Sequence, residues 1–196
     1  MVSHTRVPRS VSAARSRELI LDAALALFAE RGYDETTTDQ VAELAGVSPR
    51  TFFRYFPTKE SVVFYRDFGL MRRFEAELNV QPAGLTDYDA ICSTFVALSR
   101  GFDELRERVQ RYRRAVDSSP VLLGWEHGHS REHARTISEA LARRHGHAAP
   151  SDEDAALGDL GVLLYNRAFA AWLGGKGTVD LGEELEREFE RVRRVV

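Results

Sequence analysis

The chain has 196 residues, of which 43% are hydrophobic, and its formal net charge at pH 7 is −3. This apolar content suffices for one medium domain, or for a small module joined to a larger one, and it excludes a disordered chain. The mild charge argues against a protein that coats nucleic acid without specificity. Because the sequence has no apolar run of 18 residues and no secretory signal, we expect a cytoplasmic protein with no membrane partner.

The charges are unevenly distributed along the chain. Residues 60–196 hold 23 of the 30 acidic residues but only 19 of the 27 basic ones, so that this part is net negative. Residues 1–17 contain no acidic residue and four arginines, Arg6, Arg9, Arg15 and Arg17. We therefore interpret residues 1–15 as a flexible basic arm that meets phosphates or a minor groove, with a merely solubilising role as the alternative.

Two helices are predicted before residue 46. The first has its apolar residues at the spacing of one buried helix face and ends at Gly32, a left-handed cap. Those apolar residues are Ile20, Ala23, Ala24, Leu27 and Phe28. Thr37 stands three residues before Gln40, which is the spacing of a capping box. It opens a short second helix, whose inward side chains are expected to be Val41, Ala42 and Leu44.

A third helix follows the turn at Gly46. Ser48 suits the N-cap and Pro49 the first helical position, so the helix is predicted from Pro49 to about Phe56. Residues 37–56 thus form two helices separated by a short turn that contains glycine. This is the arrangement of a helix-turn-helix unit, whose second helix enters the major groove of DNA.

The remaining sequence predicts only helices. Thr58 is placed to cap a fourth helix that opens at Lys59 and continues to about Leu78. After a break at residues 81–84, five more helical segments follow, separated near residues 101, 118–120, 146–150 and 174–178. No segment alternates with period two. We therefore expect an all-α fold of about nine helices, with a three-helix head in residues 16–60 and a larger helical body in residues 61–196.

The third predicted helix carries the chemistry of a DNA-reading element. Phe52 and Phe56 lie four residues apart and are expected to pack inward, which directs Arg50 and Arg54 outward. Two guanidinium groups on an exposed helix suit guanine edges and phosphates. A solvated helix face is the alternative interpretation of the same two arginines.

The head also resembles the TetR/AcrR family of transcriptional regulators. Residues 36–60 read TTTDQVAELAGVSPRTFFRYFPTKE and follow LFAERGY at residues 27–33. The resemblance covers residues 16–62 without a gap. It implies a symmetric homodimer that binds a palindromic operator in double-stranded DNA, represses transcription, and is released when a small-molecule effector enters the body.

The same resemblance implies roles for individual residues. Thr37 and Thr38 would lie near one phosphate, Tyr55 on the DNA backbone, and Lys59 on a further phosphate. Residues 48–51 would lie at the floor of the groove, namely Ser48, Pro49, Arg50 and Thr51. Phe53 stands where the family more often has tyrosine, so we expect it to contact a sugar or a thymine methyl group. Helix capping alone is the alternative explanation for Thr37 and Ser48.

Two segments of the body are predicted to form the dimer interface, by resemblance to the last two helices of the family. The segment near residues 154–172 has a face of small residues that would allow a close approach of a partner helix, and the apolar stripe of the segment near residues 180–194 is flanked by charges. The residues expected at the interface are Leu157, Leu160, Leu164, Ala168, Leu185, Phe189 and Val192. The alternative is that both helices cover a core within the chain.

Several aromatic residues of the body are candidates for the lining of a ligand pocket. They are Phe68, Phe95, Phe102, Tyr112, Trp125, Tyr165, Phe169 and Trp172. As a set, aromatic residues are more often part of the core than of a ligand site. The sequence does not identify the effector.

No metal or cofactor is expected. A single cysteine, Cys92, leaves a thiolate zinc site three ligands short, and we interpret it as a packed apolar residue. His127, His129 and His133 stand close together in sequence, and His129 and His133 are one helical turn apart. No remote residue offers this pair a third ligand at a known spacing.

Two other classes of function compete with DNA binding. The sequence has no nucleophile elbow, phosphate loop, metalloprotease pair or dinucleotide fingerprint, so we expect no enzyme. A helical dimer whose head binds a protein is the second alternative. The exposed Arg50 and Arg54 beside a basic arm favour DNA over both.

Overall fold

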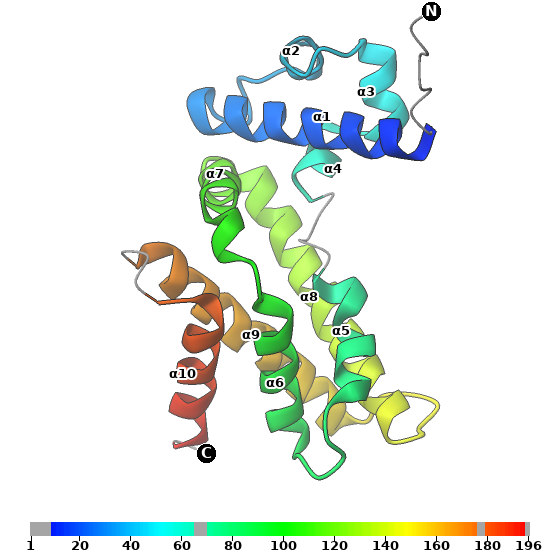
Figure 1. Cartoon of the computed structure of the whole chain (residues 1–196), viewed down its shortest axis with the longest axis vertical. Coiled ribbons are helices and arrows are strands. Elements are labelled where there is room, and N and C mark those ends of the chain that lie inside the picture. The colour runs from blue at the N-terminus through cyan, green and yellow to red at the C-terminus, as the bar shows by residue number, and fades with distance from the viewer. Residues whose placement is uncertain (1–8, 65–69, 176–178, 195–196) are drawn as a thin grey trace, which may run out of the picture. The chain divides into compact units, whose positions relative to one another are not determined.

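The computed structural model describes residues 9–64, 70–175 and 179–194. Within these ranges every regular element is a helix, as predicted for the fold class (Figure 1). The described residues form two compact units. The first unit comprises residues 9–64 and 108–125, and the second comprises residues 70–107 and 126–194. The head therefore includes a segment that lies far beyond residue 60 in the sequence.

The first unit is built on one long helix. α1 packs against α2 and α4, and α2 packs against α3. The four helices are α1 (Arg9–Arg31), α2 (Thr38–Leu44), α3 (Pro49–Tyr55) and α4 (Lys59–Val63). Residues 108–125 complete the core, because Ala115, Val116 and Leu122 are fully buried in the same apolar cluster as Ile20 and Phe28.

The structure extends the first helix toward the N-terminus. α1 begins at Arg9, so residues 9–15 are helical and the expectation of a flexible arm up to residue 15 is wrong for them. The expectation rested on the arginines and on the absence of an apolar stripe, but residues 9–15 contain no proline or glycine that would end a helix. Arg6 lies outside the described residues.

The second unit is a bundle of longer helices. α10 packs on α9 and α6, while α6 also contacts α5 and α9. Its complete helices are α5 (Leu70–Val80), α6 (Asp87–Ser99), the short 3-10 helix η1 (Asp103–Leu105), α9 (Asp152–Gly174) and α10 (Leu181–Arg193). Two further helices, α7 (Arg106–Asp117) and α8 (Pro120–Arg144), belong partly to each unit.

The predicted fourth helix is two helices. α4 ends at Val63 and α5 begins only at Leu70, so one helix from Lys59 to Leu78 was wrong, and the described residues contain ten α-helices instead of about nine. Phe64, the C-cap residue of α4, has a φ of −94° and a ψ of 4°, which lie outside the helical region. Its apolar stripe continued across the break, so hydrophobic spacing alone could not reveal it.

Small residues on α9 bring it close to α8. A Cβ atom on Gly158 would lie 2.3 Å from Ser138 Oγ and 2.4 Å from the carbonyl oxygen of Ala134. Gly161 makes a similar but looser approach to Ile91. The sequence predicted that such residues would admit a partner helix, whereas here they admit a neighbouring helix of the same chain.

Gly158→Ala is expected to destabilise the second unit by roughly 1–3 kcal/mol, because the new methyl group must displace a backbone carbonyl. Thermal unfolding monitored by circular dichroism measures the effect. Gly128→Ala is the matched control: it lies within α8 with nothing within 4 Å of a new Cβ. It should be neutral or stabilise the helix by up to about 1 kcal/mol. Equal effects of both substitutions would contradict the close approach.

Among the described residues, no helix combines the length and the apolar composition needed to cross a bilayer.

Candidate nucleic-acid interface

Local capping contacts fix the helix-turn-helix. Thr37 Oγ1 accepts a hydrogen bond from the Gln40 backbone N–H, and the Gln40 side chain accepts one from the Thr37 N–H, so the predicted capping box is confirmed. In the turn, Gly46 adopts a φ of 66°, which side chains other than glycine rarely tolerate. Ser48 Oγ then accepts from the Thr51 N–H and starts α3 at Pro49.

An apolar base holds α2 and α3 together. Phe52 and Phe56 are fully buried, as predicted, and Val41 is buried beneath them. Leu44 is 56% exposed, so its expected inward orientation is wrong. The helix ends there, and the buried position one turn after Val41 is occupied by Ala45 instead.

The outer face of α3 is exposed as predicted. Arg50 and Arg54 are exposed. Between them in sequence, Phe53 is 50% exposed and adds an apolar surface to the same face. Ser48 and Pro49 at the start of the helix are also exposed. The face therefore presents two guanidinium groups, one aromatic ring and the N-terminus of a helix to solvent, a combination suited to base edges and phosphates.

The hydroxyl groups at the helix starts are already engaged. Ser48 Oγ and Thr51 Oγ1 lie 2.9 Å apart and hydrogen-bond to each other. Thr37 caps α2, and Thr38 is the first residue of that helix and partly exposed. Capping therefore accounts for Thr37 and Ser48 in the structure, and their contact with phosphate stays a prediction.

Tyr55 connects α3 to α1. The Arg54 Nη2 donates a hydrogen bond to the Tyr55 hydroxyl at 3.1 Å, and its guanidinium carbon lies 4.7 Å from the centre of the ring. The guanidinium carbon of Arg17, on α1, lies 4.9 Å from the same centre. Sequence reasoning placed Arg17 only in a basic region, because nothing in the sequence indicates that it meets a tyrosine 38 positions later.

Lys59 has a structural role that the sequence did not predict. Its Nζ donates to the carbonyl oxygens of Tyr33 at 2.7 Å and Thr36 at 2.9 Å, and it lies over the Tyr33 ring. Burial lowers the pKa of Lys59, although Asp34 and Glu60 favour its charged form. Tyr33 also donates a hydrogen bond to the Glu60 carboxylate. Of the three donors of the ammonium group, one is left for a phosphate, so the predicted DNA contact stays a prediction.

Comparisons with known proteins agree with this geometry. The family model for bacterial regulatory proteins of the tetR family matches residues 20–65. The HTH-type transcriptional regulator TcmR of Streptomyces glaucescens is 36% identical in an alignment 138 residues long that covers 67% of this chain and 61% of TcmR. The chain belongs to the tetR family of bacterial regulatory proteins. TcmR is an HTH-type transcriptional regulator, so the comparison favours a regulatory function for this chain over an enzymatic one. The match to TcmR spans less than two thirds of that protein.

Solved structures show that the whole TetR-family fold is present. A TetR transcriptional regulator from Rhodococcus sp. RHA1 superposes with a TM-score of 0.55 at 20% identity, over 95% of this chain and 97% of that one. SmeT in its complex with triclosan superposes with a TM-score of 0.60 at 18% identity, over 92% of this chain and 90% of that one.

The aromatic residues predicted to line a pocket of this TetR-family chain are divided between the two units. In the second unit, stacked or tilted rings link Phe95 to Tyr165, Phe169 and Trp172, and Phe102 meets Trp172 edge to face. In the first unit, Phe64 contacts both Tyr112 and Trp125. Phe68 lies outside the described residues.

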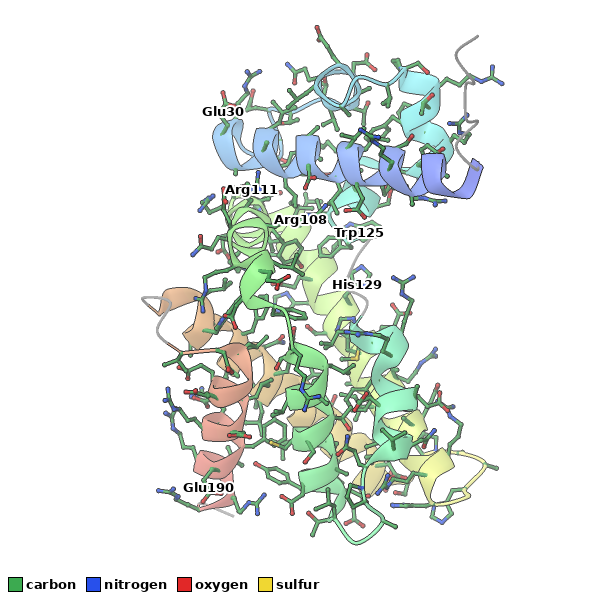
Figure 2. The ribbon with its side chains drawn as sticks, viewed as in Figure 1. Glu30, Arg108, Arg111, Trp125, His129 and Glu190 are labelled. Carbon is green, nitrogen blue, oxygen red and sulfur yellow. The ribbon has the colours of Figure 1, made fainter. Side chains whose placement is uncertain are left out.

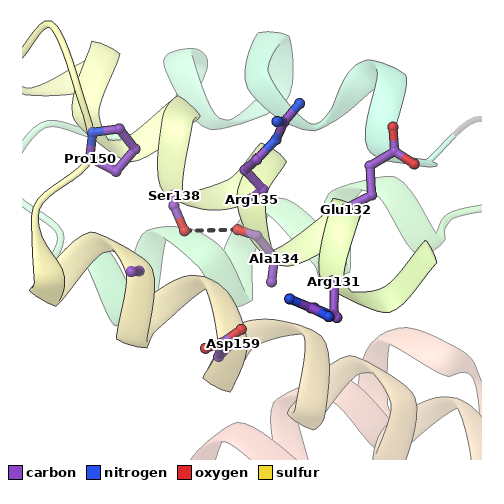
Figure 3. Close-up of a pocket in the computed structure, with 8 residues that line it drawn as sticks. Arg131, Glu132, Ala134, Arg135, Ser138, Pro150 and Asp159 are labelled. Atoms are coloured by element: carbon purple, nitrogen blue, oxygen red, sulfur yellow. Dashed lines mark hydrogen bonds between the residues drawn. The ribbon is translucent and has the colours of Figure 1, made fainter. Parts of the chain in front are cut away.

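A groove of about 710 Å³ lies elsewhere on the second unit, between α8 and α9, and none of those aromatic residues lines it. Figure 3 shows Arg131, Arg135 and Asp159 around it, with the Ser138 hydroxyl hydrogen-bonded to the Ala134 carbonyl oxygen at 2.8 Å. The sequence had not singled out these polar residues, because they follow no recognisable spacing.

The cysteine and the histidines form no metal centre in the part of the chain that the structure describes. No group of three or more candidate ligands is close enough to hold an ion there. Burial raises the pKa of the Cys92 thiol to about 11, which keeps it protonated. His129 lies 3.8 Å from Glu132, one turn away on α8 (Figure 2).

Four of the residues predicted at the dimer interface are buried within the chain itself. Leu164, Ala168, Leu185 and Phe189 have essentially no exposed surface, while Leu157, Leu160 and Val192 are partly exposed. The alternative that these helices cover an intramolecular core therefore holds for the four buried residues. The exposed face of α9 instead carries Leu163, which is 55% exposed.

Proposed function

We propose that this TetR-family chain binds a palindromic operator as a homodimer, represses transcription and is released by a small-molecule effector. The observation that supports this most is the exposed face of α3, where Arg50, Phe53 and Arg54 lie together on a rigid, buried base. Direct readout of sequence requires side chains that reach the base edges, and a helix with exposed guanidinium groups meets that requirement.

A duplex selection experiment tests this proposal. Random 30-base-pair duplexes are enriched on the purified protein, and the enriched sequences are examined for an inverted repeat and measured by gel shift. Enrichment of an inverted repeat supports the proposal, because the two-fold symmetry of a dimer must be matched in its site. If no sequence is enriched while the protein is folded, DNA recognition is wrong and the alternative of a protein-binding head gains support.

For the dimer, we propose the exposed face of α9 as the contact. Leu163 is the largest exposed apolar residue described on that helix, and Ala156 and Ala170, about two turns to either side, are also exposed. A leucine flanked by small residues lets two copies of the helix approach closely and removes Leu163 from water.

Leu163→Glu is expected to convert the dimer to a folded monomer, because it places two charges against each other across a two-fold axis. Light scattering gives the mass, and circular dichroism should show unchanged helicity because the residue is exposed. Val80→Glu, at an apolar residue of α5 that is 72% exposed, is the control and should leave the dimer intact. A Leu163→Glu protein that stays dimeric would place the interface elsewhere.

Release by an effector is tested on the same enriched duplex. A panel of small molecules is added to the complex, and a releasing compound should weaken binding in proportion to its own preference for the unbound protein. The complementary measurement is thermal stabilisation of the free protein by that compound.

A further inference from the structure

Arg108, on α7, is held by two carboxylates of α1. Its Nη2 donates to Glu18 Oε2 at 2.7 Å and lies 3.0 Å from Asp22 Oδ1. Glu18 and Asp22 are one helical turn apart, so a single guanidinium group spans both. The Arg108 side chain is only 17% exposed, and its position on α7 is marked in Figure 2. The carboxylate partners are more open to water, with Glu18 32% and Asp22 52% exposed, so the shielding of these ion pairs comes from the Arg108 side.

The same turn of α1 contacts the reading helix. Arg17 directly precedes Glu18, and its guanidinium group lies over the ring of Tyr55 on α3. Tyr55 in turn accepts a hydrogen bond from Arg54, one of the two arginines of the reading face. A continuous set of contacts thus runs from Arg108 through one turn of α1 to Arg54, and all of it lies within the first unit.

We propose that Arg108 is a positioning residue for DNA recognition. Its ion pairs with Glu18 and Asp22 fix the rotation of α1, and α1 in turn holds Tyr55 and Arg54 in the orientation that reads DNA. This inference rests on the proposed DNA binding and adds to it a residue that lies outside the helix-turn-helix. Arg108 is also the residue at which the chain re-enters the first unit after residues 70–107.

The contact between α7 and α1 is not fully satisfied. The Nε atoms of Arg108 and Arg111, which Figure 2 marks on α7, are buried and have no hydrogen-bond partner among the described residues. A buried donor without a partner lowers stability. This contact is therefore less stable than one whose polar groups are all paired.

Variants that replace a charged side chain by a neutral one of similar size distinguish positioning from simple electrostatic attraction to DNA. Arg108→Gln removes a positive charge, whereas the double variant Glu18→Gln with Asp22→Asn removes two negative charges. If the residues acted only through attraction to DNA, Arg108→Gln would lower the affinity and the double variant would raise it. Positioning predicts that both weaken binding to the enriched duplex, by roughly 2- to 30-fold, as is typical of residues that act through a contact network. The triple variant, which combines all three substitutions, should have a DNA affinity no lower than that of the weaker-binding of these two variants, because all three residues serve one contact.

Two further variants complete the experiment. Arg114→Gln makes the same charge change on an exposed residue of α7, for which no ion pair is recorded among the described residues, and should lose less than half the affinity. Arg108→Lys should recover most of the binding, because it restores the charge. Affinity for a scrambled duplex should be nearly equal in all variants, and circular dichroism shows whether each is folded.

Tighter binding by the Glu18 and Asp22 variant, or equal losses for Arg108→Gln and Arg114→Gln, would overturn the positioning role while leaving DNA recognition intact. If the unaltered protein enriches no duplex, the proposed function itself fails, and this inference fails with it. The two failures are therefore distinguishable.

Discussion

Arg50→Ala and Arg54→Ala are each expected to remove most of the specific DNA binding. Loss of an arginine that contacts a base costs roughly 1–3 kcal/mol and relaxes the choice of base at that position. Arg54 should have the larger effect, because it also holds the Tyr55 hydroxyl. Gel shifts with the enriched duplex measure the affinity, and duplexes substituted at single positions reveal which base each arginine reads.

The stability of the head should not change in these variants. Arg50 and Arg54 are exposed and contribute nothing to the apolar base formed by Phe52 and Phe56. Arg187→Ala on α10, also exposed, is the control for loss of a positive charge remote from the reading helix in sequence. Two arginine variants that bind the duplex normally would show that α3 is not the reading helix.

Leu185→Arg combined with Phe189→Glu is expected to unfold the second unit. The sequence alone predicts that this pair yields a folded monomer, but both side chains are fully buried within the chain. Phe189 also contacts Phe95 and Tyr88, and its carbonyl oxygen accepts a hydrogen bond from the Tyr88 hydroxyl at 2.6 Å. Replacing two such residues even by alanine costs about 5–10 kcal/mol, which is comparable to the whole stability of a domain, and burying the charges of arginine and glutamate adds to that cost.

Circular dichroism distinguishes the two outcomes. The double variant should lose much of its helical signal, whereas Leu163→Glu on the exposed face of α9 should keep it. If the double variant remains helical and is merely monomeric, then Leu185 and Phe189 face a partner in solution and not their own core.

The part of the fold that is governed by local contacts could be predicted from the sequence. Thr37, Ser48 and Thr58 each begin a helix where their capping chemistry placed it, and Gly46 forms the turn between α2 and α3. These signals act over three or four residues, so they do not depend on the rest of the chain.

What the sequence could not provide depends on tertiary contacts. An apolar stripe such as that of Leu185 and Phe189 shows that a face is covered, but not whether the same chain or a second copy covers it. Lys59 illustrates the same limit at the candidate site, because its position suggests a phosphate contact while its ammonium group is fixed by the carbonyl oxygens of Tyr33 and Thr36.

The discontinuous core of the first unit has a consequence for how this protein is made and how it can be divided. Ala115, Val116 and Leu122 fill the core that Ile20 and Phe28 begin. During synthesis, the core of the head cannot be completed until residues up to about 125 have left the ribosome. Its apolar surface therefore stays exposed to water while the intervening residues are synthesised. For the same reason, grafting residues 1–66 alone onto another regulator would leave a gap in the transplanted head, and a working chimera must also carry residues 108–125.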